Sequence, residues 1–395
     1  MNGFDLSTVT NIYLGSTPVK EVYMGTKLIW PTDTFDYSRE YFTIESLEDY
    51  NQIGIVESGR PSIEISTDKQ TWTTVTPNAA PTYFITLNAG EKVYIKGSNN
   101  AYYDYSWTTP GYFTSTGQFN VSGNIMSLIY GDDFKNKTTL SSSNTDAFAY
   151  LFYKANKLIT AEHLVLLATT LPDGCYQGML ANCTSLTTAP ELPATTLKPW
   201  CYSSMFYGCT SLTTAPELPA TELADGCYQS MFTSCTSLTK APYLPATALA
   251  DYCYQYMFSG CTSFTTAPEL PATELADECY AYMFQGCIFL TKAPELPATT
   301  LANGCYGYMF SDCSSLTTAP ELPAATSTEY CYDHMFYDCK SLNYIKMLAT
   351  NVSATSCMQY WVYGVAYYGT FVKDASTTLP TGDNGIPNGW TVETV

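Results

Sequence analysis

The sequence predicts an α/β repeat solenoid of 26-residue coils, preceded by an all-β sandwich or jelly-roll domain and a short N-terminal β-hairpin segment. Three observations predict this fold. All 15 cysteines recur with one period between Cys175 and Cys357, short alternating apolar and polar runs fill residues 32–145, and a ten-residue echo lies within residues 1–31. The predicted divisions are 1–31, 32–145, a solenoid of nine coils over 146–365, and a C-terminal cap over 366–395.

The N-terminal segment contains the related runs IYLGSTPVK from Ile12 and VYMGTKLIW from Val22. Both alternate apolar and polar residues around a glycine, which predicts short strands that are too small to be stable alone. One interpretation is an edge hairpin on the next domain. The other is a docking peg that uses Tyr13, Tyr23 and Trp30.

The same segment resembles N-terminal segments of tail and appendage proteins of phages that infect gut Bacteroidales. About 20 residues carry the resemblance, through the pattern Tyr13, Gly15, Val19, Val22, Tyr23 and Gly25. What this resemblance implies is attachment to a virus particle through residues 1–31.

Residues 32–145 are predicted to form a β-sandwich or jelly-roll domain. Runs such as EYFTIES, SIEISTDKQTW and YFITLNAGEKVYIKG alternate in character and are divided by Gly, Asn and Pro. Alternation of this length is typical of antiparallel strands with one buried face. The piece STDKQTW is interpreted as a hairpin within this domain.

The solenoid is predicted from the cysteines, which fall in pairs eight residues apart and repeat every 26 residues. A period of this length, with no unit able to bury its own apolar face, indicates coils that stack to share one core. The first coil has Ala147 and Ala155 at the two cysteine positions. The last coil keeps Cys357 at the first cysteine position but has Val365 at the second cysteine position. Terminal coils usually depart from the consensus, and Trp390 is expected to cover the last coil.

The cysteines are predicted to be reduced residues that pack in the core. Ala and Val replace them in the end coils, and neither residue can replace a disulfide partner or a zinc ligand. Disulfides and a bound metal remain the alternatives. The first members are Cys175, Cys201, Cys227, Cys253, Cys279, Cys305, Cys331 and Cys357, and the second members are Cys183, Cys209, Cys235, Cys261, Cys287, Cys313 and Cys339.

The repeat resembles the BspA-like (Treponema-type) leucine-rich repeats, whose pattern runs I-G-x-x-A-F-x-x-C-x-x-L. In CYQSMFTSCTSL the matching residues are Cys227, Met231, Phe232, Cys235 and Leu238. The resemblance implies a curved, leucine-rich-repeat-like solenoid with a parallel sheet on one face, helical turns on the other, and a role in adhesion or ligand binding. It carries over no catalytic residue and no cofactor.

One series of surface residues is a candidate binding site. The third residue after each first cysteine is Gly178, Ser204 or Ser230 in the early coils and then becomes aromatic. Such a stripe is suited to stacking against sugars or anchoring a protein, although the rings could simply shield the face. The candidate ligand-binding residues are Tyr256, Tyr282, Tyr308, His334 and Tyr360.

A second series repeats along the APELPA segments. We interpret these side chains as solvated, with a bound cation or a basic partner as the alternative. They are Glu191, Glu217, Tyr243, Glu269, Glu295 and Glu321.

Composition narrows the function. The net charge of −19 at pH 7 disfavours nucleic acid and anionic lipid as partners, and there is no apolar run of about 18 residues for membrane insertion. The first residues carry neither a basic segment nor an apolar run of 7–15 residues, so we expect no secretory signal. Only two histidines occur, and no nucleophile or phosphate-binding motif is present. We therefore expect a non-enzymatic protein without catalytic residues, cofactors or metal.

The favoured hypothesis is a phage virion structural appendage, of head or tail fibre type, assembled in the host cytoplasm. Residues 1–31 would contact other virion proteins, and the solenoid would present a binding face to a host-surface glycan or protein. A homotrimer is the expected assembly. The alternatives are a bacterial cell-surface adhesin of the BspA type and an intracellular scaffold.

Overall fold

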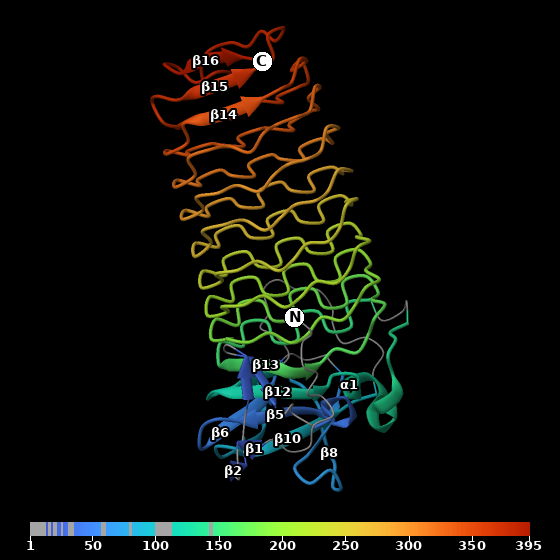
Figure 1. Ribbon diagram of the computed structural model, residues 1–395. Helices are drawn as coiled ribbons and strands as arrows, with labels where there is room; N and C mark the ends of the chain where they lie inside the picture. Colours follow the sequence, from blue (N-terminus) through green and yellow to red (C-terminus); the bar gives the residue numbers. More distant parts are fainter. Residues whose placement is uncertain are drawn as a thin grey trace.

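The computed structural model shows an elongated molecule, with a β-rich unit at one end and a stack of coils leading to a small sheet at the other (Figure 1). It describes residues 35–56, 61–78, 81–98, 113–141 and 145–395, together with the backbone of four short strands between residues 13 and 30. None of the helices within these residues is long and apolar enough to cross a membrane.

The four N-terminal strands form two separate hairpins. Strand β1 (Tyr13–Leu14) pairs antiparallel with β2 (Thr17–Pro18), and β3 (Val22–Met24) pairs antiparallel with β4 (Lys27–Trp30). Each half of the sequence echo is therefore its own hairpin. The side chains of the proposed docking residues Tyr13, Tyr23 and Trp30 lie outside the described part of the chain.

The β-rich unit contains a six-stranded sheet, in the order β13-β12-β5-β10-β7-β8, and a three-stranded sheet, in the order β11-β6-β9. Apolar side chains on alternate positions of the strands, such as Phe42 and Ile44, are fully buried, as alternation predicted. The elements are η1 (Tyr37–Arg39), β5 (Phe42–Ser46), β6 (Asn51–Ile55), β7 (Ile63–Ser66), β8 (Thr73–Val75), β9 (Thr82–Leu87), β10 (Lys92–Lys96), β11 (Phe113–Ser115), β12 (Phe119–Asn124), α1 (Ser127–Tyr130), η2 (Gly131–Asn136) and β13 (Leu158–Val165).

Strand β13 joins the β-rich unit to the coil stack. It pairs in parallel with β12 on one side, and on the other a bridge links Thr160 to Thr188 of the second coil. The sheet therefore continues past residue 146, where the sequence predicted a domain boundary. As a result, the first coil has a hydrogen-bonded neighbour on both sides.

One side of every coil is a run of hydrogen-bonded turns, which we call the turn face. It comprises residues 146–154 in the first coil and the equivalent residues 174–182, 200–208 and so on. Along this face the backbone amides alternate between two kinds of acceptor. One amide donates to the carbonyl three residues earlier, and the following amide donates to a carbonyl of the next coil. Successive coils therefore share five backbone hydrogen bonds here. For one coil step these are Tyr252→Asp277, Tyr254→Cys279, Tyr256→Ala281, Phe258→Met283 and Gly260→Gln285.

This arrangement replaces the helical turns that the repeat resemblance implied. Residues 145–395 contain no helix. The opposite side of the coil, which we call the bridge face and which carries the APELPA segments, was expected to form a parallel sheet. Apart from β13 and the C-terminal strands it forms isolated parallel bridges, such as Thr266 to Lys292. Proline has no amide hydrogen for a sheet ladder, and each APELPA segment contains two prolines.

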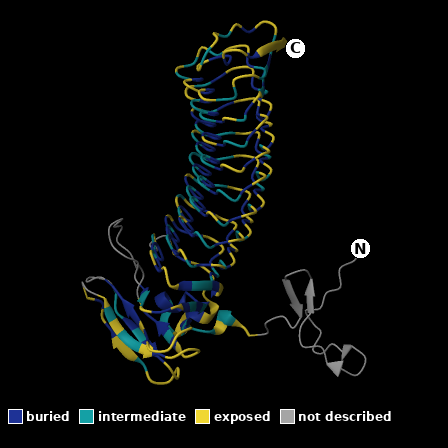
Figure 2. Cartoon of the chain, turned by 90° about the vertical axis from the view of Figure 1, so that its left-hand side faces the viewer, coloured by how far each residue is buried: buried dark blue, intermediate teal, exposed yellow. Residues whose placement is uncertain are grey.

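Columns of identical side chains form the core of the stack, which runs as a continuous buried strip between exposed edges (Figure 2). The tyrosine after each first cysteine, from Tyr176 to Tyr332, is at most 2% exposed. These rings stack 5.6–6.2 Å apart, centroid to centroid. A parallel column of phenylalanines from Phe206 to Phe336 has spacings of 5.5–5.9 Å.

All 15 cysteines are buried free thiols, as the core interpretation predicted. Burial raises the pKa of the Cys201 thiol to about 12. The second cysteine of each pair also has a polar role, because its Sγ donates to a carbonyl of the preceding coil over 3.0–3.2 Å. Ala155 lies in the first coil and has no preceding coil to bond, which explains why alanine is tolerated there.

The C-terminal end is closed by a parallel sheet of β14 (Tyr344–Met347), β15 (Thr370–Lys373) and β16 (Thr391–Thr394). Trp390 is buried, as expected of a capping residue, and its Nε1 donates to the Ala366 carbonyl over 2.7 Å. Trp361 is fully buried and packs between the ends of the core columns and Phe371.

Candidate functional site

The turn face places three residues per coil in the left-handed backbone region, four residues apart. In the second coil these are Gly174, Gly178 and Asn182, with φ of 60°, 56° and 59°. Any residue other than glycine costs about 1 kcal/mol or more in this region. Even so, large side chains occupy many of these positions. The face therefore carries bulky residues at positions where backbone energetics favour glycine.

The middle position of each triplet, which we call the middle series, contains all the predicted ligand-binding residues. Its first member is Tyr150, and its next three are Gly178, Ser204 and Ser230. The later members form a stack with centroid distances of 4.3 Å for Tyr256–Tyr282, 4.5 Å for Tyr282–Tyr308 and 4.3 Å for Tyr308–His334, whose interplanar angles are 5–12°. Tyr360 continues the series but is tilted by 49° to His334, at 5.3 Å.

This stack changes what the predicted stripe can bind. A ring that stacks on its neighbours has no free face for a sugar, so the column presents edges and hydroxyl groups. Burial is the main cause of the raised pKa of Tyr256, Tyr282 and Tyr308, so their hydroxyls stay protonated at neutral pH. His334 Nδ1 lies 2.7 Å from Asp333 Oδ1. The column is therefore a rigid wall, and the ring-face stacking that the sequence suggested is not available inside it.

A groove of about 850 Å³ lies beside the column, over the early coils. It forms where Gly178, Ser204 and Ser230 stand in place of the rings of the later coils. Its volume is in the range of small-ligand sites. Its lining combines rings, amides, hydroxyls and carboxylates: Asp146, Tyr150, Tyr153, Asp173, Gly174, Gln177, Ala181, Asn182, Trp200, Ser203, Ser204, Tyr207, Gln229 and Ser230.

The rings of the groove are held by glycines on the following coil. A Cβ on Gly178 would lie 2.3 Å from the Tyr150 ring, and one on Gly226 would lie 2.4 Å from the Trp200 ring. Each ring thus covers the next coil closely and is fixed in direction. Trp200 and Tyr207 nevertheless remain 37% and 40% exposed. Unlike the rings of the column, they leave apolar surface open to a ligand.

The charges lie on the rims of the groove. Asp146 and Asp173 lie on one rim, on neighbouring coils, and Asp146 N donates to the Asp173 carbonyl. Burial, and then the Asp173 charge, raise the pKa of Asp146. Lys154 Nζ lies 4.8 Å from the centroid of Tyr153. Lys198 lines a neighbouring hollow of about 210 Å³ together with Asp173.

The backbone of the groove floor is already bonded to the next coil. Ser204 N donates to the Gln229 carbonyl over 2.7 Å, and Ser230 N donates to the Gln255 carbonyl over 2.8 Å. An incoming peptide strand would find no free amide at these positions to pair with. Recognition must therefore use side chains.

Sequence reasoning identified the middle series but assigned binding to its aromatic members alone. The groove depends on the small members, which the sequence shows as a run of three coils without a ring. This run of small residues was the sequence feature that could have indicated the groove. The other groove residues, such as Trp200 and Tyr207, differ from coil to coil and have no periodic signature.

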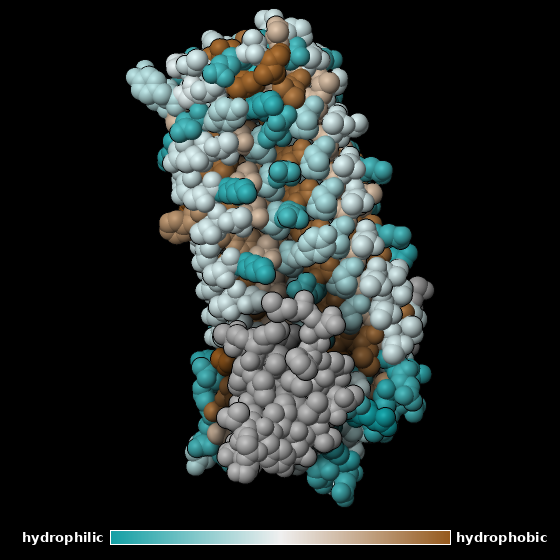
Figure 3. Space-filling model, in the orientation of Figure 1, coloured by the Kyte–Doolittle hydropathy of each residue, from teal (hydrophilic) through white to brown (hydrophobic). Residues whose placement is uncertain are grey.

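Two other surface features are less suited to binding. The predicted glutamate series of the bridge face is solvent-exposed, and Glu321 pairs with Lys346 at 2.9 Å. A hollow of about 730 Å³ on the same face is lined by Pro, Thr, Ala, Leu, Lys292, Glu295 and Glu321, without an aromatic ring. The visible face of the stack in Figure 3 is mostly pale, with scattered hydrophilic side chains and a broken hydrophobic strip.

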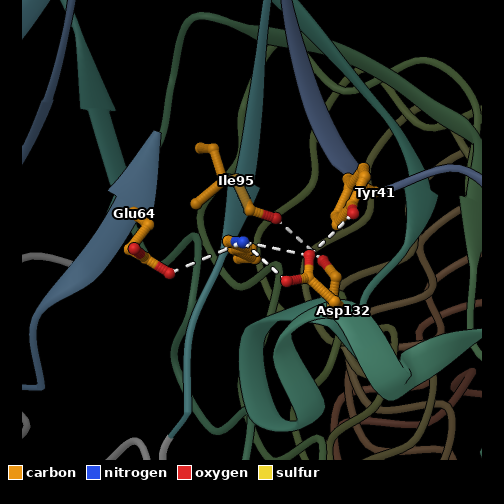
Figure 4. Close-up of polar contacts among 6 residues, drawn as sticks. Tyr41, Glu64, Ile95 and Asp132 are labelled. Carbon is orange, nitrogen blue, oxygen red and sulfur yellow. Dashed lines mark hydrogen bonds and ion pairs between the residues drawn. The ribbon is translucent and has the colours of Figure 1, made fainter. Parts of the chain in front are cut away.

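A cluster of titratable groups surrounds Lys96 in the β-rich unit (Figure 4). Its side chain is 9% exposed, and Nζ lies 2.9 Å from both Asp132 oxygens and 3.7 Å from Glu64 Oε2. The ammonium also lies 4.2 Å from the Trp72 ring centroid. Tyr41 donates to Asp132 over 2.8 Å, and burial, followed by that hydrogen bond, raises its pKa to about 12. Through Lys96 the cluster links β10 to β7 and to η2.

Among the described residues, no three His, Cys, Asp or Glu side chains are grouped so that they could hold a metal ion. The profile of the BspA type leucine rich repeat region, in six copies, matches residues 150–291 and 227–360. These matches together span more than half of the chain. No curated protein and no solved structure matches it.

Proposed function

The chain belongs to the BspA type leucine-rich repeat family, and we propose that it is a non-enzymatic attachment protein that binds a cell-surface saccharide in the turn-face groove. The family match indicates an adhesin-like repeat protein. The groove adds a site with the chemistry of saccharide binding, because exposed rings suit the apolar faces of sugars, and amides and hydroxyls suit their hydroxyl groups.

The observation that carries this proposal is the composition of the groove around Trp200. The partly exposed rings of Trp200 and Tyr207 line it together with Gln177, Asn182 and Gln229. Each amide offers both a donor and an acceptor, which matches a hydroxyl that also does both. The hollows of about 730 and 210 Å³ have no aromatic ring and no side-chain amide in their lining.

A saccharide-cleaving activity is less well supported by the same groove. Glycoside hydrolases place two carboxylates on either side of the bond that is cleaved, with separated pKa values. The pKa of Asp146 is raised, chiefly by burial. Asp146 and Asp173 lie on the same rim, however, on adjacent coils, and cannot flank a sugar from opposite sides.

The direct test is a glycan microarray probed with the full chain and with Trp200→Gly. Glycine suits this position because φ is 61° and the equivalent residues Gly174, Gly226 and Gly304 already stand there. We expect the wild-type chain to bind a defined group of saccharides and the variant to bind them at least about tenfold more weakly. The matched control is Tyr243→Ala, which removes a 60% exposed ring from the bridge face.

The control should bind as the wild type does. Absence of binding to any saccharide, or full binding by Trp200→Gly, would contradict the proposed function. Incubation of the bound saccharides with the chain, followed by mass spectrometry, should show them intact.

Where the protein is displayed remains a separate proposal. The particle appendage and its virion partners were inferred from residues 1–31, which the family profile does not reach. The family match favours the alternative of a bacterial cell surface. Immunogold labelling of producing cells and of particles released from them separates the two, because gold on particles supports the appendage and gold on cells supports the adhesin. The homotrimer stays a prediction.

A further inference from the structure

We infer that the ligand of the turn-face groove is a linear, uncharged glycan that lies along the stack axis, with about one sugar for each coil. This ligand assignment rests on the proposed function and adds the shape, direction and charge of the saccharide. Four observations carry it: the course of the groove, the repeat of its polar groups, the absence of cationic side chains from its lining, and its saturated backbone.

The floor of the groove runs along the stack. Ser204 and Ser230 line the groove at equivalent positions of successive coils, and each is bonded through its backbone to the next coil. The Tyr150 ring covers Gly178 at one end, and the aromatic column begins at Tyr256 beyond the other end. A groove of this course fits a chain and not a compact branched group.

The polar groups repeat once per coil. Gln177, Ser203 and Gln229 occupy the same position in three successive coils and line the groove. The buried Tyr176, Tyr202 and Tyr228 rings beneath them are 5.6 and 5.9 Å apart. One pyranose unit of an extended β-linked chain advances by a comparable length. Successive sugars of such a chain can therefore meet the side chains at the same position of successive coils.

The lining has no cationic side chain, and its two charged residues, Asp146 and Asp173, are both carboxylates. An ionic group between the serines of the groove would lose hydration without a counter-ion beside it, which is costly. An anionic ligand would in addition be repelled by Asp146 and Asp173. An uncharged chain avoids both penalties.

A peptide is the rival ligand, and the backbone argues against it. Extended peptides gain most of their affinity by pairing with free backbone groups at a sheet edge. The amides of Ser204 and Ser230, which line the groove, are both used between coils. Hydroxyl-rich chains do not need such an edge.

The test is calorimetric titration of the full chain with cello-, manno- and N-acetylchito-oligosaccharides of two to six sugars, and with oligogalacturonates of the same lengths as the anionic series. We expect at least one neutral series to bind, with affinity that rises with each added sugar up to about four and then stays constant. The oligogalacturonates should bind at least tenfold more weakly.

Ser204→Tyr is the decisive variant, because it places a ring inside the groove at the middle series. Tyrosine stands at the equivalent positions of four later coils, Tyr256, Tyr282, Tyr308 and Tyr360, also with positive φ, so the fold accepts it there. We expect this variant to lose binding of the neutral series at least tenfold. The matched control is Glu269→Tyr, which adds a ring on the bridge face at the position where the preceding coil has Tyr243, and it should bind normally.

Equal affinity for short and long chains, preference for the anionic series, absence of binding by every neutral series, or unchanged binding by Ser204→Tyr would overturn the inference. Capture of an extended peptide in competition with the glycan would favour the rival ligand. The first three of these results would leave the proposed function intact if the microarray shows binding of a branched or terminal sugar and that binding is lost in Trp200→Gly. It would fail if no saccharide binds at all.

Discussion

Replacing Trp361 with alanine should lower the local free energy of unfolding of the C-terminal coils by about 3–5 kcal/mol. Trp361 is fully buried, and its Nε1 donates to the Gly385 carbonyl over 2.8 Å. Its ring contacts Tyr332, Phe336 and Phe371, so it ends both core columns and joins them to the C-terminal sheet. Alanine would leave a cavity at this junction and an unpaired carbonyl at Gly385.

The loss should appear first at the C-terminal end. In a repeat protein each coil contacts only its neighbours, so a defect at the end frays the nearest coils before the distant ones. Hydrogen exchange should accelerate in residues 330–395 and stay unchanged in residues 174–250. Tyr367→Ala is the control, since Tyr367 is 74% exposed in the same region. Uniform acceleration along the whole stack would contradict this account.

Replacing Gly123 with alanine should destabilise the junction between the β-rich unit and the coil stack by about 3 kcal/mol. Gly123 pairs with Leu164 of β13 and has φ of 79°. A Cβ at this position would lie 2.0 Å from the Tyr41 carbonyl oxygen, which is a backbone atom and cannot turn away. The strand must therefore shift, and β12 links the two parts of the molecule.

Gly90→Ala separates the two causes of this cost. Gly90 has a similar φ of 83°, but a Cβ there would meet no atom within 4 Å. The control should therefore lose only the left-handed strain, about 1 kcal/mol. Denaturant unfolding followed by circular dichroism measures both variants. Equal losses for Gly123→Ala and Gly90→Ala would show that contact with Tyr41 is unimportant.

The core of the coil stack could be predicted from the sequence because it is periodic. The cysteine, methionine and phenylalanine columns each recur every 26 residues, and burial follows from that recurrence. The end coils have Ala147, Ala155 and Val365 at the cysteine positions. These substitutions indicated that the cysteines are small core residues, neither metal ligands nor disulfide partners. The β-strands of residues 32–145 were likewise visible as alternation.

The turn face could not be predicted, for two physical reasons. Its hydrogen bonds join residues about 25 positions apart, so no local pattern announces them. Its left-handed positions, moreover, are often filled by residues such as Trp200, Tyr256 and Glu278, which give no sign of a positive φ. The resemblance to a repeat with helical turns then suggested the wrong local structure.

The surface series that forms the candidate site was visible in the sequence, but its geometry was not. The sequence identified the middle series and its change from small to aromatic residues, and the structure stacks Tyr256, Tyr282, Tyr308 and His334 together. It could not show that the rings cover one another's faces, because that depends on side-chain direction. The groove over the small members followed only from the placement of Trp200 and Tyr207 beside them.

Hydroxyl-radical footprinting with mass spectrometry tests most directly whether this groove is the binding site. The full chain is oxidised alone and with a saturating saccharide from the microarray. We predict protection of Trp200 and Tyr207, while Tyr243 on the bridge face and Tyr367 near the C-terminus, which are 60% and 74% exposed, keep their rates. Unchanged oxidation of Trp200 and Tyr207, with protection of Tyr243 instead, would contradict the account.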